Sequence, residues 1–176
     1  MFCHPDLSRP VRKTDFETSQ NYTTTTVALV TSSSGNKVNV MSAEWSIRVS
    51  IEPFLIGLFV GYERETYNLI KDSGEFGLSY CSDQQGGLAH IAGNFSFKDT
   101  DKFATGKFRT FPSKYIKAPL VDGSISNYEC KVIDEFKMGD HAAFVGKVLE
   151  GYYDDEKRPL VFHQGKFFHL GERIKK

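Results

Sequence analysis

A histidine stands at the start of an apolar run in the second half of the chain, directly after a short polar turn. The segment reads Gly139-Asp140-His141-Ala142-Ala143-Phe144-Val145-Gly146. A histidine at the tip of a strand lies at the rim of a sheet, where a ligand can reach it. The unperturbed pKa of imidazole is close to neutrality, so His141 can meet a ligand in its charged or its neutral form. The alternative is a histidine satisfied at a hairpin end, and the residues alone favour neither interpretation.

A second segment that could do chemistry connects two predicted strands and contains small and polar residues. Its members are Met41, Ser42, Ala43, Glu44 and Trp45. Small polar side chains let backbone amides approach a flat polar ring, and apolar neighbours can form a bed beneath that ring. The alternative is an ordinary strand connection, which is favoured when this segment is considered by itself.

Two further segments carry groups that could hold a phosphate. Glu63-Arg64-Glu65-Thr66 opens a predicted helix. The free N–H groups and the dipole of a helix start attract anions; Arg64 can form paired hydrogen bonds and Thr66 can donate its hydroxyl. In the loop that begins at Asn94, the residues Asn94, Ser96 and Lys98 could form a second side of the same site. A solvated helix start and a mobile surface loop are the respective alternatives.

The composition argues against several other functions. Lys plus Arg and Asp plus Glu each number 22, so no net field favours nucleic acid or an anionic membrane, and neither is expected as a partner. The three cysteines form no CxxC pair, which argues against disulfides and zinc and fits a reducing cytosol. The histidines lack metal-ligand spacing, so no metal is expected. No apolar run can span a bilayer and no signal peptide is evident, which predicts a cytoplasmic protein.

Hydrophobic periodicity predicts that strands dominate the chain. They are expected over residues 23–31, 38–41, 45–50, 54–61, 75–80, 127–132, 142–149 and 159–170. Turns at 34–37 and 137–140 form hairpins, the second of type II′ with Gly139 at its first central position. One helix is predicted over 64–72, ended by Gly74, and another after a capping box of Ser82 and Gln85. Residues 94–119 are expected to be an irregular loop, either functional or mobile.

The number and order of these elements indicate the fold class. A chain of 176 residues is typical of one domain, here predicted over 1–176. Strands outnumber helices and most are linked by turns, which favours a mainly β protein, an antiparallel barrel with a few peripheral helices. A parallel sheet would need helices between most strands, and the sequence does not predict them.

The order of eight short segments resembles that of the flavin reductase-like family of FMN-binding split barrels. They are Val27-Ala28-Leu29-Val30-Thr31, Asn39-Val40-Met41-Ser42-Ala43, Val49-Ser50-Ile51-Glu52-Pro53, Val60-Gly61-Tyr62-Glu63-Arg64-Glu65-Thr66, Ser73-Gly74-Glu75-Phe76, Asp101-Lys102-Phe103, Lys117-Ala118-Pro119-Leu120 and the Gly-Asp-His element at 139–141. The resemblance covers roughly Thr25 to Leu170. It implies an antiparallel split β-barrel of Greek-key-like topology with a few peripheral helices.

The same resemblance implies a function and a site. It implies FMN as cofactor, NAD(P)H as co-substrate, and a homodimer with the flavin at the interface. His141 is the expected catalytic residue, which orients the nicotinamide. The expected cofactor-binding residues are Met41, Ser42, Ala43, Glu44, Trp45, Gly61, Arg64, Thr66, Asn94, Ser96 and Lys98. Electrons would pass to free flavin, ferric iron or a protein acceptor such as a redox protein or a monooxygenase. The alternative is a flavoredoxin-type electron carrier that does not itself oxidise NAD(P)H.

Glu44 departs from the family pattern, because members more often carry a small polar residue at this position. A carboxylate beside a flavin phosphate would repel it unless an arginine such as Arg48 or Arg64 lies between them. The sequence therefore predicts either that Glu44 points away from the phosphate or that the pocket differs from that of its relatives.

Overall fold

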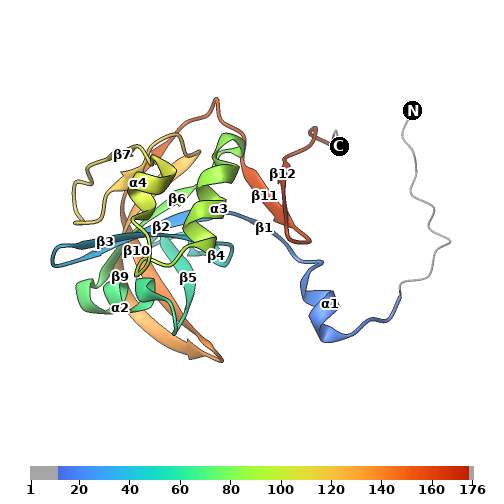
Figure 1. Cartoon of the computed structure of the whole chain (residues 1–176), viewed down its shortest axis with the longest axis horizontal. Helices are drawn as coiled ribbons and strands as arrows, with labels where there is room; N and C mark the ends of the chain where they lie inside the picture. Colours follow the sequence, from blue (N-terminus) through green and yellow to red (C-terminus); the bar gives the residue numbers. More distant parts are fainter. Residues whose placement is uncertain (1–11, 175–176) are drawn as a thin grey trace.

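The computed structural model describes residues 12–174 and is dominated by one antiparallel sheet of seven strands (Figure 1). The strands are β2 (Ala28–Ser34), β3 (Lys37–Ala43), β4 (Ser46–Ser50), β5 (Leu55–Gly61), β6 (Glu75–Tyr80), β9 (Ser126–Met138) and β10 (His141–Tyr153). They lie in the order β3-β2-β6-β9-β10-β5-β4, and every neighbouring pair is antiparallel. The predicted mainly β, antiparallel class is confirmed.

The two edge strands of this sheet, β3 and β4, are consecutive in the chain. Only Glu44 and Trp45 separate them, and two residues span at most about 7 Å. The sheet must therefore curl so that its opposite edges approach each other at this link. Within residues 12–174 the edge strands are not hydrogen-bonded to one another, so closure into a barrel stays a prediction, as does a single domain over 1–176.

The main core fills the inside of the curled sheet. Its largest fully buried side chains include Phe76 on β6, Phe144 on β10 and Leu58 on β5. Gly146 makes room for one of them, because a Cβ there would lie 2.6 Å from Cζ of Phe76. The β9–β10 register shifts between Val145 and Gly146, and such bulges bend a strand and increase its twist. This core holds the strand ends that form the site.

Helices cover the sheet beside its β2–β3 edge. They are α2 (Glu65–Ser73), the 3₁₀ turn η1 (Asp83–Gln85), α3 (Gly86–Asn94) and α4 (Lys102–Gly106). Ala89 and Ala92 of α3 pack with Leu29 and Val40 in a second buried cluster. The capping box is present, with Gln85 Oε1 accepting from the Ser82 N–H at 2.9 Å. The packing explains why α3 forms although it begins with two glycines.

A small sheet packs beside the seven-stranded sheet, on the side where Figure 1 shows α1 (Phe16–Gln20), and its Leu160 is buried in the second cluster. It contains β1 (Thr24–Thr26), β11 (Leu160–His163) and β12 (Lys166–His169), in the order β1-β11-β12. Two strand predictions are wrong here. The run 23–31 changes sheets at Val27, and the run 159–170 is a hairpin, because Gln164 and Gly165 both have positive φ (50° and 72°) and turn the chain.

The other local predictions succeed where turn chemistry is clear. Gly35, Gly74 and Gly139 all have positive φ at the predicted turns and helix end. Only the first central residue of the 138–141 turn has positive φ, as type II′ requires. The strands predicted over 127–132 and 142–149 are longer than expected, because they pair along most of their length as β9 and β10.

The region 94–119 is not wholly irregular, since it contains α4 and β7 (Thr110–Phe111), which pairs with β8 (Leu120–Val121). Asp101 caps α4 by accepting from the Ala104 N–H at 3.1 Å.

Cys81 and Cys130 are buried free thiols. Burial raises the pKa of each thiol, that of Cys81 to about 12. Cys3 lies outside the described residues. None of the helices found between residues 12 and 174 is long and apolar enough to cross a membrane.

Candidate functional site

Two adjoining pockets collect the residues that the sequence singled out. The cation pocket, about 220 Å³, is lined by Asn39, Met41, Glu63, Arg64, Glu65, Thr66, Ala92, Asn94, Phe95, Ser96, Phe97, Lys98 and Lys102. The aromatic pocket, about 240 Å³, is lined by Met41, Ser42, Ala43, Glu44, Trp45, Phe59, Val60, Gly61, Arg64, Gly93 and His141. Met41 and Arg64 belong to both. Every predicted site residue therefore lies in one of two connected hollows.

The aromatic pocket is formed where three strands end. His141, the first residue of β10, lies opposite Gly61, the last residue of β5. The Trp45 and His141 rings stand 4.7 Å apart between centroids, with their planes at 40°. The antiparallel register thus places a histidine and an indole together, although 96 positions separate them in the chain (141 less 45).

Asp140 holds the His141 ring in place. The Asp140 Oδ1 and His141 Nδ1 atoms are 2.7 Å apart, so Nδ1 donates to the carboxylate. This hydrogen bond lowers the pKa of Asp140. The other ring nitrogen, Nε2, has no hydrogen bond among residues 12–174, and the side chain is about one quarter exposed. His141 therefore keeps a nitrogen for a ligand at the rim of the sheet.

Glycines allow close backbone approach around the aromatic pocket. A Cβ at Gly61 would lie 2.6 Å from a carboxylate oxygen of Glu63. At Gly93 a Cβ would lie 3.3 Å from Cβ of Ser42, so this glycine lets α3 approach β3. These two glycines therefore let the Glu63 side chain and strand β3 pack close to the backbone that surrounds the pocket.

Glu44 lies in the aromatic pocket and does not line the cation pocket. Its side chain is half-buried, and burial raises its pKa. Neither Arg48 nor Arg64 forms an ion pair with it in the described part of the chain, since Arg64 pairs with Glu63 instead. Arg64 lines both pockets whereas Glu44 lines only the aromatic one, so the expectation that the Glu44 carboxylate points away from a phosphate stays a prediction.

The start of α2 forms one side of the cation pocket. Arg64 is its N-cap residue and makes no side-chain cap hydrogen bond, which leaves the first helical N–H groups without that partner. Thr66 is buried, and its Oγ1 accepts a hydrogen bond from Nδ2 of Asn39 at 3.0 Å. The Thr66 hydroxyl hydrogen is thus available to a ligand. An uncapped helix start beside an arginine is suited to an anion.

The segment 94–98 forms the opposite side. Lys98 Nζ lies 2.6 Å from Oε1 of Glu65, as Arg64 Nε lies 3.1 Å from Oε1 of Glu63. The Ser96 hydroxyl oxygen accepts from the Lys98 N–H at 3.1 Å. The Asn94 amide is directed back onto its own helix, donating to the His90 carbonyl at 2.9 Å. The pocket therefore brings two cations together, each held by a neighbouring carboxylate.

Two buried polar residues of the lining were not predicted as site residues. Asn39 is buried and its Oδ1 has no hydrogen-bond partner among the described residues. Lys102 is buried, and its Nζ donates to the carbonyls of Val40 and Ala92. The signal for Lys102 was the Asp101-Lys102-Phe103 segment, but a lysine in a short helix is usually solvated, so its burial could not be read from the sequence.

The fold and the paired pockets define a protein suited to a ligand with a flat polar ring and a phosphate. Comparison with known proteins agrees. Residues 20–171 match the model of the flavin reductase like domain, and the chain belongs to that family. The predicted family resemblance is confirmed, and membership supports an oxidoreductase that uses a flavin.

Two relatives and one solved structure are similar to this chain in sequence or in fold. The chain is 37% identical over 138 residues to an uncharacterised protein of Pyrococcus abyssi, covering 78% of this chain and 77% of the relative. It is 29% identical over 133 residues to the NADH-dependent flavin reductase of Rhodococcus sp, covering 75% and 70% respectively. The fold matches Streptomyces globisporus C-1027 NADH:FAD oxidoreductase SgcE6 with a TM-score of 0.85, at 22% identity, over 93% of this chain and all of that one.

Proposed function

We propose that this protein is an FMN-binding oxidoreductase that moves a hydride from NAD(P)H to flavin, and electrons onward to free flavin, ferric iron or a protein acceptor. The observation that carries the proposal is the pair of connected pockets. The aromatic pocket is lined by aromatic rings, including His141, and by backbone, and the cation pocket is lined by cations and an uncapped helix start. A flavin mononucleotide has the same two parts, a flat ring and a phosphate.

The described residues fit each part of that cofactor. Met41, Ser42, Ala43, Trp45 and Gly61, which line the aromatic pocket, would bind the ring system. Arg64, Thr66, Ser96 and Lys98 would hold the phosphate. The bound flavin would supply the hydride-accepting chemistry, while the protein orients the two rings and excludes competing reactions.

His141 would orient the nicotinamide. Asp140 fixes one nitrogen of its ring, and the Trp45 indole packs against one side of it. Nε2 can therefore donate or accept at one place on the rim of the aromatic pocket. This arrangement supports a positioning role, because a hydride donor must be held close to the accepting ring and correctly aligned with it.

We also propose a homodimer with the flavin at its interface. The edge strand β4 carries Ile47 and Val49 on one face, with side chains 59% and 52% exposed, and Ile51 follows them. Phe136 and Met138 near the end of β9 are about half exposed. Large apolar side chains exposed on an edge strand are typical of interaction sites. A second copy seated on this edge would also cover Trp45 at the mouth of the aromatic pocket.

The dimer is tested by placing a charge on the β4 edge. Ile47→Asp should convert the protein to a monomer, measured by light scattering after size-exclusion chromatography. Arg48→Gln is the matched control, since Arg48 alternates to the other face of β4 and should leave the dimer intact. A wild-type monomer at all concentrations, or a dimeric Ile47→Asp variant, would refute this interface.

The oxidoreductase proposal is tested by the visible absorption spectrum of the protein mixed with FMN, followed under anaerobic conditions. Flavin bands that bleach on adding NADH or NADPH support the reductase. Bands that bleach only with dithionite favour the flavoredoxin-type carrier. FAD in place of FMN tests the choice of flavin, and no binding of either would remove the proposal. With reductase activity established, ferric iron, free flavin and a monooxygenase partner can be compared as acceptors.

A further inference from the structure

Lys102 is a buried cation with an unusual set of partners. Its side chain is only 5% exposed although it opens a helix of five residues. Its Nζ donates to the carbonyl of Val40 at 2.9 Å and to that of Ala92 at 3.0 Å. No carboxylate forms an ion pair with it within residues 12–174. An ammonium group has three donors, so one remains for a group inside the cation pocket.

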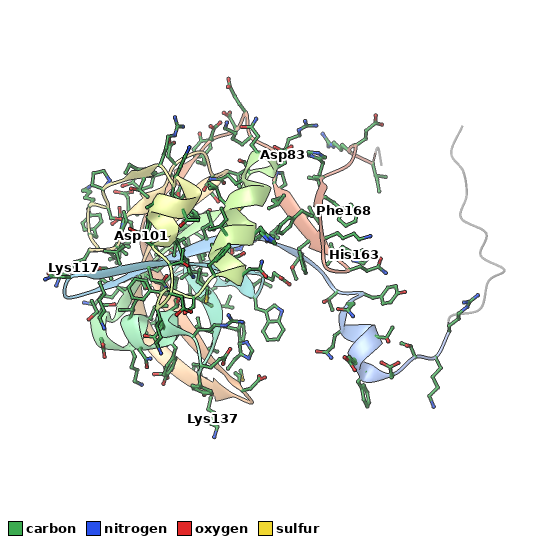
Figure 2. All side chains as sticks on the ribbon, in the orientation of Figure 1. Asp83, Asp101, Lys117, Lys137, His163 and Phe168 are labelled. Atoms are coloured by element: carbon green, nitrogen blue, oxygen red, sulfur yellow. The ribbon has the colours of Figure 1, made fainter. Side chains whose placement is uncertain are left out.

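The two hydrogen bonds join opposite walls of the site. Val40 lies on β3 directly before Met41, which lines both pockets, and Ala92 lies on α3 directly before Gly93. Lys102 comes from α4 and therefore connects three elements around one hollow. Asp101, labelled in Figure 2, caps the same helix and sets where Lys102 enters. The position of the ammonium is thus determined by the scaffold rather than by the ligand.

The other two cations of the pocket differ from Lys102 in both exposure and pairing. The side chains of Arg64 and Lys98 are 56% and 69% exposed, and Glu63 and Glu65 neutralise them. An anion that enters must compete with these carboxylates for Arg64 and Lys98. Lys102 has no such competitor in the described chain, and a buried unpaired charge is costly unless it gains a partner.

We propose that Lys102 makes the cation pocket selective for flavins that carry a phosphate, and that Glu63 and Glu65 oppose this selectivity by holding Arg64 and Lys98. The proposal rests on the flavin function proposed above. Lys102 contributes an uncompensated charge and a free donor at the floor of the pocket. Glu63 and Glu65 weaken the binding of the same anion, which leaves the cofactor exchangeable.

The test is the ratio of the dissociation constants for riboflavin and FMN, measured from the quenching of flavin fluorescence. Lys102→Met keeps the length of the side chain and removes its charge. It should weaken FMN binding about tenfold or more, because hydrogen bonds to charged groups are the stronger ones. Riboflavin binding should change less than about twofold. Lys117→Met is the matched control, because Lys117 is an exposed lysine that lines neither pocket (Figure 2).

Removing the charge of Glu63 or Glu65 should strengthen FMN binding, whereas removing the charge of Lys102 should weaken it. Neither glutamate belongs to the hydrophobic core. Glu63→Gln and Glu65→Gln should each strengthen FMN binding about threefold, the effect of freeing one exposed cation, and should leave riboflavin binding unchanged. Weaker or unchanged FMN binding in both variants would overturn the competing role. Equal losses for FMN and riboflavin in Lys102→Met would overturn the selective role and leave Lys102 as a brace between β3 and α3.

A measurement on the wild-type protein covers the case in which Lys102→Met does not fold. Burial, and then Arg64, lower the pKa of Lys102 to about 8. The preference for FMN over riboflavin should therefore decrease between about pH 7.5 and 9.5. The phosphate keeps its charge there, with a second pKa of about 6. The charged groups facing Lys102 are Arg64, Lys98, Glu63, Glu65 and Asp101. Of these, Lys98 is held by the Glu65 carboxylate, which raises the pKa of Lys98.

Each outcome separates this inference from the function on which it rests. A wild-type protein that binds neither flavin fails the proposed function. A protein that binds FMN and riboflavin equally well, or whose preference is constant with pH, retains a flavin function and overturns the role of Lys102. A preference for FMN that decreases about tenfold in Lys102→Met, and decreases in the wild type as the pH rises, supports it.

Discussion

The cation pocket and the aromatic pocket adjoin and share Met41 and Arg64, yet they are built differently. The aromatic pocket uses strand ends placed by sheet register, as where His141 faces Gly61. The cation pocket uses a helix start, a loop and a second short helix. In the cation pocket the exposed cations Arg64 and Lys98 already have carboxylate partners. In the aromatic pocket Trp45 stands beside His141, whose Nδ1 is hydrogen-bonded to Asp140 and whose Nε2 has no partner among residues 12–174. The ring site is thus ready for a flat ligand, and the anion site must exchange partners to bind.

This difference predicts that substitutions in the two pockets change the binding of different ligands. Changes in the cation pocket should affect FMN and spare riboflavin, because only FMN has the phosphate. Changes in the aromatic pocket should affect both flavins, or the reaction with nicotinamide. The expected effects below are ordered from the largest to the smallest.

Replacing the shared arginine should have the largest effect. Arg64→Ala should weaken FMN binding about a hundredfold, because a guanidinium is the strongest phosphate partner in the pocket and binds in a paired geometry. Titration by fluorescence quenching measures the change. Arg48→Ala removes an exposed arginine from β4, outside both pockets, and should have no effect. A loss of riboflavin affinity as large as that of FMN would show that Arg64 belongs mainly to the ring site.

His141→Ala should slow the reaction with NADH without releasing flavin. Loss of the oriented ring should reduce kcat/KM for NADH about thirtyfold, since misplaced reactants lose much of the advantage of proximity. Stopped-flow absorbance at the flavin band gives the rate, and the dissociation constant for FMN should change less than about threefold. His163→Ala, a histidine outside both pockets, is the control. An unchanged rate would remove His141 from the reaction.

Trp45→Ala should weaken FMN and riboflavin to the same degree, by about tenfold, which is the effect of losing one aromatic contact. The same titration measures both ligands. Phe168→Ala is a suitable control, because Phe168 is a partly exposed aromatic residue on β12, away from both pockets (Figure 2). A loss confined to FMN would contradict the assignment of Trp45 to the ring.

The smallest expected effect is on the pH dependence of stability. Burial lowers the pKa of Lys102 from 10.5 to about 8. Between those values the unfolded chain holds a proton that the folded protein has released, so this group makes stability rise with pH. The difference in free energy of unfolding, wild type minus Lys102→Met, should grow by about 1 kcal/mol from pH 7.5 to 9.5. Urea denaturation at both pH values tests this, and a constant difference would contradict it.

Local signals in the sequence predicted much of the fold and the members of the site. Gly35, Gly74 and Gly139 marked turns and a helix end, because positive φ is costly for other residues. The strand predictions failed at places where one apolar run contains two strands that pair with different partners. At Val27 and at Gln164 the periodicity continues, but the chain changes sheet or direction there, since pairing partners elsewhere in the chain decide where a strand stops.

By itself, the sequence determined the antiparallel β class and the family, because these depend on local pattern and residue type. It also singled out the residues from Met41 to His141 that line the two pockets, whose contacts with a flavin stay a prediction. The tertiary structure alone decided which segments meet. It paired Lys98 with Glu65 and buried Lys102 between β3 and α3. Burial and charge pairing depend on distances between residues far apart in the chain, which no local pattern contains.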